Sequence, residues 1–152
     1  MQLIHKLLDY SLKWSLPHVA IFTGNPVTRR DGAIVMGRGA AKQVRDTYPN
    51  VQYALGEIIK PEDYLVFVPI DNTNVHTPSE QFIGWFKVKN HWQQPAELEL
   101  ITLSTKALYD LAIKHQDMSF HMNYPGIGNG KLTVDDVGGI LSILPDNVFI
   151  YK

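Results

Sequence analysis

The sequence has no cysteine among its 152 residues. Disulfide bonds, thiolate metal sites and cysteine nucleophiles are therefore excluded. It also lacks a metal-binding histidine pattern, because none of its six histidines has the His-Glu-x-x-His spacing. We therefore expect no metal ion and no cofactor.

Long hydrophobic runs are lacking as well. No apolar run approaches the roughly 18 residues that a membrane span needs. Residues 1–6 have neither the basic start nor the small-residue cleavage site of a signal peptide. These observations predict a cytoplasmic protein that does not contact membranes.

The chain carries no excess of positive charge. Its 14 lysines and arginines nearly cancel 15 aspartates and glutamates, which leaves a net charge of -1. Proteins that bind nucleic acid mainly through its phosphates are usually far more basic. The balance argues against bulk electrostatic binding and leaves only a local patch for contact with DNA.

The residues that are present describe a globular protein. Apolar residues make up 45% of the chain and charged residues 19%, which is not the composition of a disordered segment. The mass of 17.2 kDa is a common size for one domain, and we find no repeat, low-complexity tract or linker. We expect a single domain over residues 1–152, and a monomer.

Short apolar runs alternate with amphipathic segments along most of the chain. Strands are predicted at 18–23, 53–59, 64–70, 82–88, 118–124 and 147–151. Helices are predicted at 40–48, 95–115 and 133–144. The first segment is ambiguous, because its leucines suit a helix while a strand over 2–7 with a turn at Asp9 fits equally well. This alternation predicts a three-layer α/β sandwich.

In two of the predicted helices, the sequence indicates either which face is buried or where the helix begins. In the long helix, Ile101, Leu108, Leu111 and Ala112 form the expected buried stripe. In the last helix, Thr133 is the expected N-cap, with two aspartates in the first turn.

Two glycine-rich loops each precede a predicted helix. They are residues 36–41, Met-Gly-Arg-Gly-Ala-Ala, and residues 126–130, Gly-Ile-Gly-Asn-Gly. Glycine lets a ligand approach the backbone N–H groups, and a following helix favours an anion such as phosphate. Together the loops suit a diphosphate, although neither matches a P-loop or a dinucleotide fingerprint. Glycines that serve only tight turns and helix packing would give the same pattern, so both interpretations stay open.

These residues carry a family resemblance. Residues 25–49, with Met36-Gly37-Arg38-Gly39 and a final Tyr-Pro, resemble the macrodomain family. The branch most similar contains the DarG antitoxin and the terminal ADP-ribose protein glycohydrolase. Residues 125–130 resemble the second phosphate loop of the family, and 86–92, Phe-Lys-Val-Lys-Asn-His-Trp, is similar to the branch's Phe-Pro-Thr-Lys-x-x-Trp segment. The matches together cover most of the chain from residue 19 to residue 151.

The resemblance implies a three-layer α/β/α sandwich around a mixed sheet of roughly six strands, with an ADP-ribose site. By carry-over, Asp9 would meet the adenine amino group, Asn25 the distal ribose, and Lys89 would be the catalytic nucleophile. The remaining ligand-binding residues implied are Met36, Gly37, Arg38, Gly39, Gly126, Ile127, Gly128, Asn129 and Gly130. An amine nucleophile must be neutral, and a lysine near pKa 10 needs burial or a cationic neighbour to become so.

The chain also departs from the branch pattern. Gly130 stands where the terminal glycohydrolase has an aspartate that helps to release its lysine adduct. The DarG-like members of the branch also lack this aspartate. Leu8 replaces a glycine, Lys87 a proline and Val134 a tryptophan.

Three functions follow as alternatives. The first is a hydrolase that removes mono-ADP-ribose from DNA or protein through Lys89. The second is a non-catalytic module that reads or sequesters ADP-ribose or a related nucleotide. The third is a phosphatase acting on ADP-ribose 1''-phosphate. The partner in each case is ADP-ribose, free, phosphorylated or attached to a macromolecule.

Overall fold

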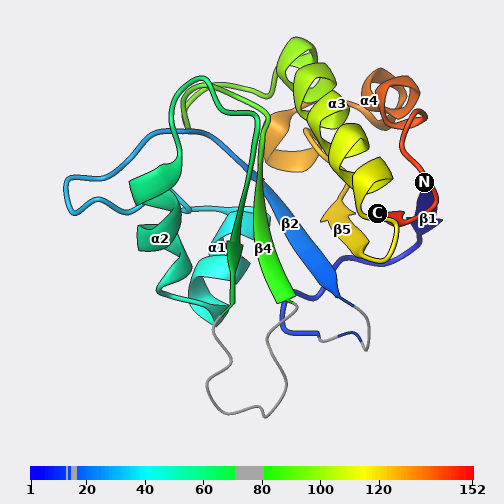
Figure 1. Ribbon diagram of the computed structural model, residues 1–152. Helices are drawn as coiled ribbons and strands as arrows, with labels where there is room; N and C mark the ends of the chain where they lie inside the picture. The colour runs from blue at the N-terminus through cyan, green and yellow to red at the C-terminus, as the bar shows by residue number, and fades with distance from the viewer. Residues whose placement is uncertain (13, 15–16, 71–80) are drawn as a thin grey trace.

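The computed structural model describes residues 1–12, 14, 17–70 and 81–152. They form a six-stranded sheet with strand order β1-β6-β5-β2-β4-β3, covered by helices on both faces (Figure 1). Strand β3 runs antiparallel to β4, and the other neighbouring strands are parallel. The strands are β1 (Gln2–Ile4), β2 (His18–Gly24), β3 (Leu65–Pro69), β4 (Gln81–Lys87), β5 (Ser119–Asn123) and β6 (Val148–Tyr151). The helices are α1 (Gly39–Thr47), α2 (Val51–Ile58), α3 (Leu98–Lys114) and α4 (Val134–Leu141), with one 3₁₀ turn, η1 (Gly128–Gly130). The predicted three-layer fold with a mixed sheet is confirmed.

Strand β2 shows how the two cores arise. Its side chains alternate, as in any strand. Ala20 and Phe22 pack on the face covered by α1 and α2, whereas Val19 and Ile21 pack on the face covered by α3 and α4. Because both faces are covered, the strand reads as one continuous apolar run, as predicted.

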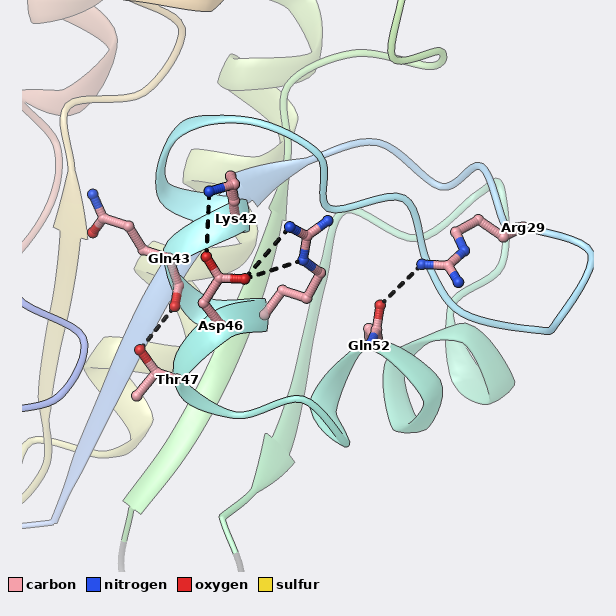
Figure 2. Close-up of polar contacts among 7 residues, drawn as sticks. Arg29, Lys42, Gln43, Asp46, Thr47 and Gln52 are labelled. Atoms are coloured by element: carbon pink, nitrogen blue, oxygen red, sulfur yellow. Dashed lines mark hydrogen bonds and ion pairs between the residues drawn. The ribbon is translucent and has the colours of Figure 1, made fainter.

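Polar contacts lie along α1 and between the loop after β2 and helix α2 (Figure 2). Asp46 lies 3.4 Å from both Lys42 and Arg45 on α1. The Arg29 guanidinium donates to Gln52 Oε1 at 3.3 Å, which ties the loop after β2 to helix α2. Lys42, Arg45 and Arg29 are thus each paired with a side-chain oxygen, from Asp46 or Gln52.

The strand predicted at 53–59 is wrong, because this segment belongs to helix α2. Its β-branched and aromatic residues favour a strand, but Val51, Leu55 and Ile59 lie four residues apart and are all buried. This is the spacing of one helical face. Gly56 fits the close packing, since a Cβ there would lie 1.8 Å from the Gly32 carbonyl oxygen. Tertiary packing therefore overrides local propensity.

Other boundaries shift by a few residues. The first segment takes the strand alternative, as β1 paired in parallel with β6. Helix α3 begins at Leu98 rather than at residue 95, because the Ala96 and Glu97 N–H groups donate to the carbonyls of Gly130 and Val88. Thr133 caps α4 in a reciprocal capping box with Asp136, which confirms that prediction.

Within the described part of the chain, no helix combines the length and apolarity that a membrane crossing requires.

Candidate functional site

A cleft of about 810 Å³ opens at the carboxyl ends of four strands. Its walls include residues at or just after these ends: Asn25 after β2, Lys89 after β4, Asn123 of β5 and Tyr151 of β6. Strands β2 and β5 are neighbours, but the chain leaves β2 toward the α1 face and β5 toward the α4 face. In open α/β sheets a crevice forms where the chain departs to opposite faces in this way, and ligands bind there.

The first glycine loop forms one side of the cleft. Gly37, Arg38 and Gly39 all line it, and α1 begins at Gly39. Gly39 has a positive φ of 56°, which favours glycine. The helix therefore presents its amino end to the cleft, where the helix dipole favours an anion.

The second glycine loop forms the opposite side and is shaped by its own hydrogen bonds. The Leu132 N–H donates to the Gly126 carbonyl at 2.9 Å, and the Lys131 N–H to the Gly128 carbonyl at 3.0 Å. Gly126 and Gly128 have φ values of 81° and 68°. A Cβ on Gly126 would also lie 2.6 Å from Ile101 Cδ1, so only glycine fits this position.

The two loops meet across the cleft. A Cβ on Gly39 would lie 3.3 Å from Asn129 Nδ2, so the first loop touches the second there. A diphosphate between them would be close to backbone N–H groups from both sides.

Lys89 lies on a third loop, residues 88–97, which returns to its starting point. The Glu97 N–H donates to the Val88 carbonyl at 2.8 Å, and the Val88 N–H to the Gly24 carbonyl at 3.1 Å. The Lys89 ammonium donates to the Trp92 carbonyl at 3.3 Å. The Trp92 side chain is 46% exposed at the cleft and stacks on His91 with ring centroids 5.3 Å apart.

The cleft is positive although the chain is not. Its lining contains the cations Arg38, Lys89, Lys131 and Lys152 and no aspartate or glutamate among the described residues. Burial, and secondarily the Arg38 guanidinium, lower the pKa of Lys89. A lowered pKa increases the fraction of neutral amine, the form that can attack an electrophile.

Asn25 is held in a fixed orientation at the end of β2. Its side chain is buried, and Oδ1 accepts the Val27 N–H at 3.0 Å in a turn. This bond fixes the amide group, and the amide nitrogen can donate to a hydroxyl in the cleft.

Comparisons with known proteins bear on this arrangement. No family model matches the sequence, and curated proteins give no match. Among solved structures, the macrodomain of Mycobacterium tuberculosis DarG is 24% identical with a TM-score of 0.71, over 99% of this chain and 97% of that one. The macrodomain of Thermus aquaticus DarG is 20% identical with a TM-score of 0.76, over 99% and 97%. Thermosipho africanus DarTG, in complex with ADP-ribose, is 21% identical with a TM-score of 0.68, over 90% of this chain and 38% of that one.

The chain has the macrodomain fold. Its likeness to DarG macrodomains agrees with the resemblance inferred from the glycine loops and the lysine segment. The cleft contains all the predicted site residues except Asp9 and Met36.

These two residues lie elsewhere. Met36 is 2% exposed and packs in the core beneath α1 and α2, so its side chain is structural. The Asp9 carboxylate accepts from the backbone N–H and the hydroxyl of Ser11, at 2.9 and 2.6 Å, outside the cleft lining. Leu7 lines the cleft close to it in sequence.

The sequence analysis missed the strand-end residues of the cleft. Asn123, Tyr124, Tyr151 and Lys152 line it, as does Lys131 of the second loop. The signal that could have found the first four is topological: they end or follow the parallel strands β5 and β6, whose carboxyl ends share one edge of the sheet. That signal requires the strand order, which the sequence does not contain.

One departure from the branch pattern has a structural explanation. Lys87, which replaces a proline, is buried, and its ammonium donates to the Pro61 carbonyl and lies 5.4 Å from the Tyr64 ring. Burial lowers the pKa of this lysine. Lys87 therefore fastens the loop after α2 and does not line the cleft.

Proposed function

We propose that this macrodomain binds ADP-ribose in the cleft and removes mono-ADP-ribose from a modified macromolecule, DNA or protein. One observation carries the proposal: two glycine loops face each other across a cleft with four cationic side chains and no described acidic one. A diphosphate fits that charge and those backbone donors. The likeness to a DarTG that is complexed with ADP-ribose supports the same ligand.

The ligand would lie across the strand ends. The loops at Gly37–Gly39 and Gly126–Gly130 would hold the diphosphate, with the distal ribose toward Asn25 and Lys89. The base would then extend toward Asn123 and Tyr151 on β5 and β6. The contact of Asp9 with adenine remains a prediction, since its carboxylate bonds to Ser11.

Lys89 would act as the nucleophile. Its neutral amine attacks the anomeric carbon of the distal ribose, a nitrogen–carbon bond forms, and the bond from that carbon to the macromolecule breaks. The attacking nitrogen, which becomes cationic as the bond forms, gives up a proton, and the leaving atom of the macromolecule takes it. Water then adds to the lysine adduct, and ADP-ribose departs as the amine is restored. The lowered pKa of Lys89 supports the first step.

Replacement of Lys89 tests the mechanism. Lys89→Ala should reduce release of ADP-ribose from modified DNA or protein by at least about 100-fold, because the nucleophile is lost. Binding of free ADP-ribose should change far less, since both glycine loops remain. The measurement is product release by chromatography with a panel of ADP-ribosylated DNA and protein, alongside Thr102→Ala as a control on the exposed face of α3. Parent-like turnover of every substrate by Lys89→Ala would exclude this mechanism.

A second function is favoured by one feature of the cleft. No aspartate or glutamate is among its described lining residues, so no acidic side chain there can act as the base for the step that adds water. A module that only reads or sequesters ADP-ribose would need none. Tight binding without any product would support that function, and steady release of ADP-ribose would exclude it.

A further inference from the structure

The loop that carries Lys89 begins where β4 ends, and one side chain fastens that end. The Ser104 hydroxyl of α3 donates to the carbonyl of Lys87 at 2.7 Å, within the buried core. Lys87 is the last residue of β4 and lies two positions before Lys89. The bond therefore joins the helix to the start of the Lys89 loop.

Ser104 is an unusual residue for its position. It is 0% exposed in the middle of α3, beside the apolar residues Ile101 and Leu108. A serine inside a helix usually faces water or bonds the carbonyl one turn back. A buried hydroxyl costs free energy unless it is paired, and this one is paired with a strand end rather than with its own helix.

The same loop is also joined to the second glycine loop. The Ala96 N–H donates to the Gly130 carbonyl at 3.0 Å, next to the Glu97–Val88 bond that closes the Lys89 loop. Backbone bonds thus hold both ends of the loop, and at its outgoing end the Ser104 side chain adds the bond that joins the Lys87 carbonyl to α3.

We propose that Ser104 is a positioning residue that holds Lys89 in place at the cleft through the Lys87 carbonyl. The proposal rests on the proposed role of Lys89 as nucleophile. Without the Ser104 hydroxyl, the Lys87 carbonyl loses its bond to α3, and the start of the loop can shift relative to that helix although the Val88 N–H still bonds the Gly24 carbonyl. A displacement of about 1 Å in a reacting group can lower a rate by as much as 100-fold.

The neighbouring residue offers a matched control. Thr105 is also 0% exposed on α3, but its hydroxyl has no hydrogen-bond partner among the described residues. Thr105→Val removes a buried hydroxyl and keeps the size of the side chain, and it breaks no bond to the end of β4. A general effect of altering α3 would therefore appear in both variants.

The experiment compares S104A with T105V by two readouts. For S104A we expect kcat about tenfold lower with the Kd for ADP-ribose within about twofold, and for T105V a parent-like kcat. The second readout is the pH profile of Lys89 modification by an amine-acylating reagent, followed by mass spectrometry, with Lys131 as internal reference. In S104A the Lys89 profile should move to higher pH, because a loosened loop exposes the amine to water.

The outcomes separate this proposal from the proposed function. If Lys89→Ala retains full turnover, the nucleophile fails, but the modification profile still tests whether Ser104 positions Lys89. A folded S104A with the parent profile and the parent kcat would overturn the proposal. Should S104A not fold, S104C keeps the side-chain volume with a weaker donor, and a profile unchanged in S104C would overturn it equally.

Discussion

Gly37 and Gly39 stand two residues apart in the first loop but meet different constraints. Gly39 has a positive φ, and a Cβ there would touch Asn129 of the second loop. Gly37 has no positive φ, and a Cβ there would meet no atom within 4 Å. Of these two glycines, only Gly39 is therefore required by the backbone, whereas Gly37 lines the cleft with open space where a Cβ would lie.

This difference predicts opposite phenotypes for two alanine substitutions. Gly39→Ala should lower the free energy of unfolding by about 1–2 kcal/mol, the cost of left-handed backbone for a residue with a Cβ. Gly37→Ala should leave it unchanged or slightly higher, because alanine restricts the unfolded chain. Urea unfolding followed by circular dichroism measures both. Equal stabilities of the two variants would refute this reading of the loop.

At the same scale, the side chains that could be predicted are those named by local motifs. Asn25, Lys89 and the glycines were predicted from the resemblance of their motifs to the macrodomain family, and the structure brings them together in the lining of the cleft. Met36 could not be assigned, since its side chain points to the core or the cleft according to how α1 packs. For Asp9 the sequence did not reveal the hydrogen bonds that its carboxylate accepts from Ser11, and its contact with adenine remains a prediction.

At the scale of elements, the predictions were correct for a continuously apolar strand and for a helix whose N-cap is visible in the sequence. Strand β2 is apolar throughout because helices cover both of its faces, and α4 starts at a cap that the sequence displays. Prediction failed at α2, which is only eight residues long and contains strand-forming residues, so that the helical spacing of its buried side chains was not recognised. It also set the start of α3 too early, since the residues before Leu98 are drawn into the Lys89 loop by backbone bonds.

At the scale of the whole molecule, stability should depend on pH through one buried histidine. His121 lies between the Trp14 and Phe149 rings, which stack on it at centroid distances of 4.0 and 5.0 Å. Its Nδ1 is 2.8 Å from the Tyr151 hydroxyl. Burial, and secondarily His18, lower the pKa of His121 to about 4. Between about pH 4 and 6.5 the unfolded chain therefore binds more protons here than the folded one, and folding weakens as the pH falls.

We expect the free energy of unfolding to fall by about 2 kcal/mol between pH 7 and pH 5 from this group alone. His121→Gln, a neutral side chain that still forms hydrogen bonds, should be less stable at pH 7 but should lose most of that slope. Urea unfolding at several pH values measures it. The same slope in both proteins would show that the pH dependence arises elsewhere.

The net charge of the molecule does not indicate the charge of its cleft. A chain of net charge -1 has four cationic side chains around one cleft, with no aspartate or glutamate among its described lining residues. Composition could not reveal this, because the cations come from three separate loops and the end of β6 and meet only when the sheet orders its strands.

Calorimetric titration with ADP-ribose, with AMP and ADP as comparisons, tests the central claim most directly. We predict that ADP-ribose binds with a micromolar Kd or tighter, more strongly than AMP or ADP, and that Asn25→Ala weakens ADP-ribose binding. No heat of binding from ADP-ribose, or equal affinity for AMP and ADP-ribose, would contradict the assignment of this cleft to ADP-ribose.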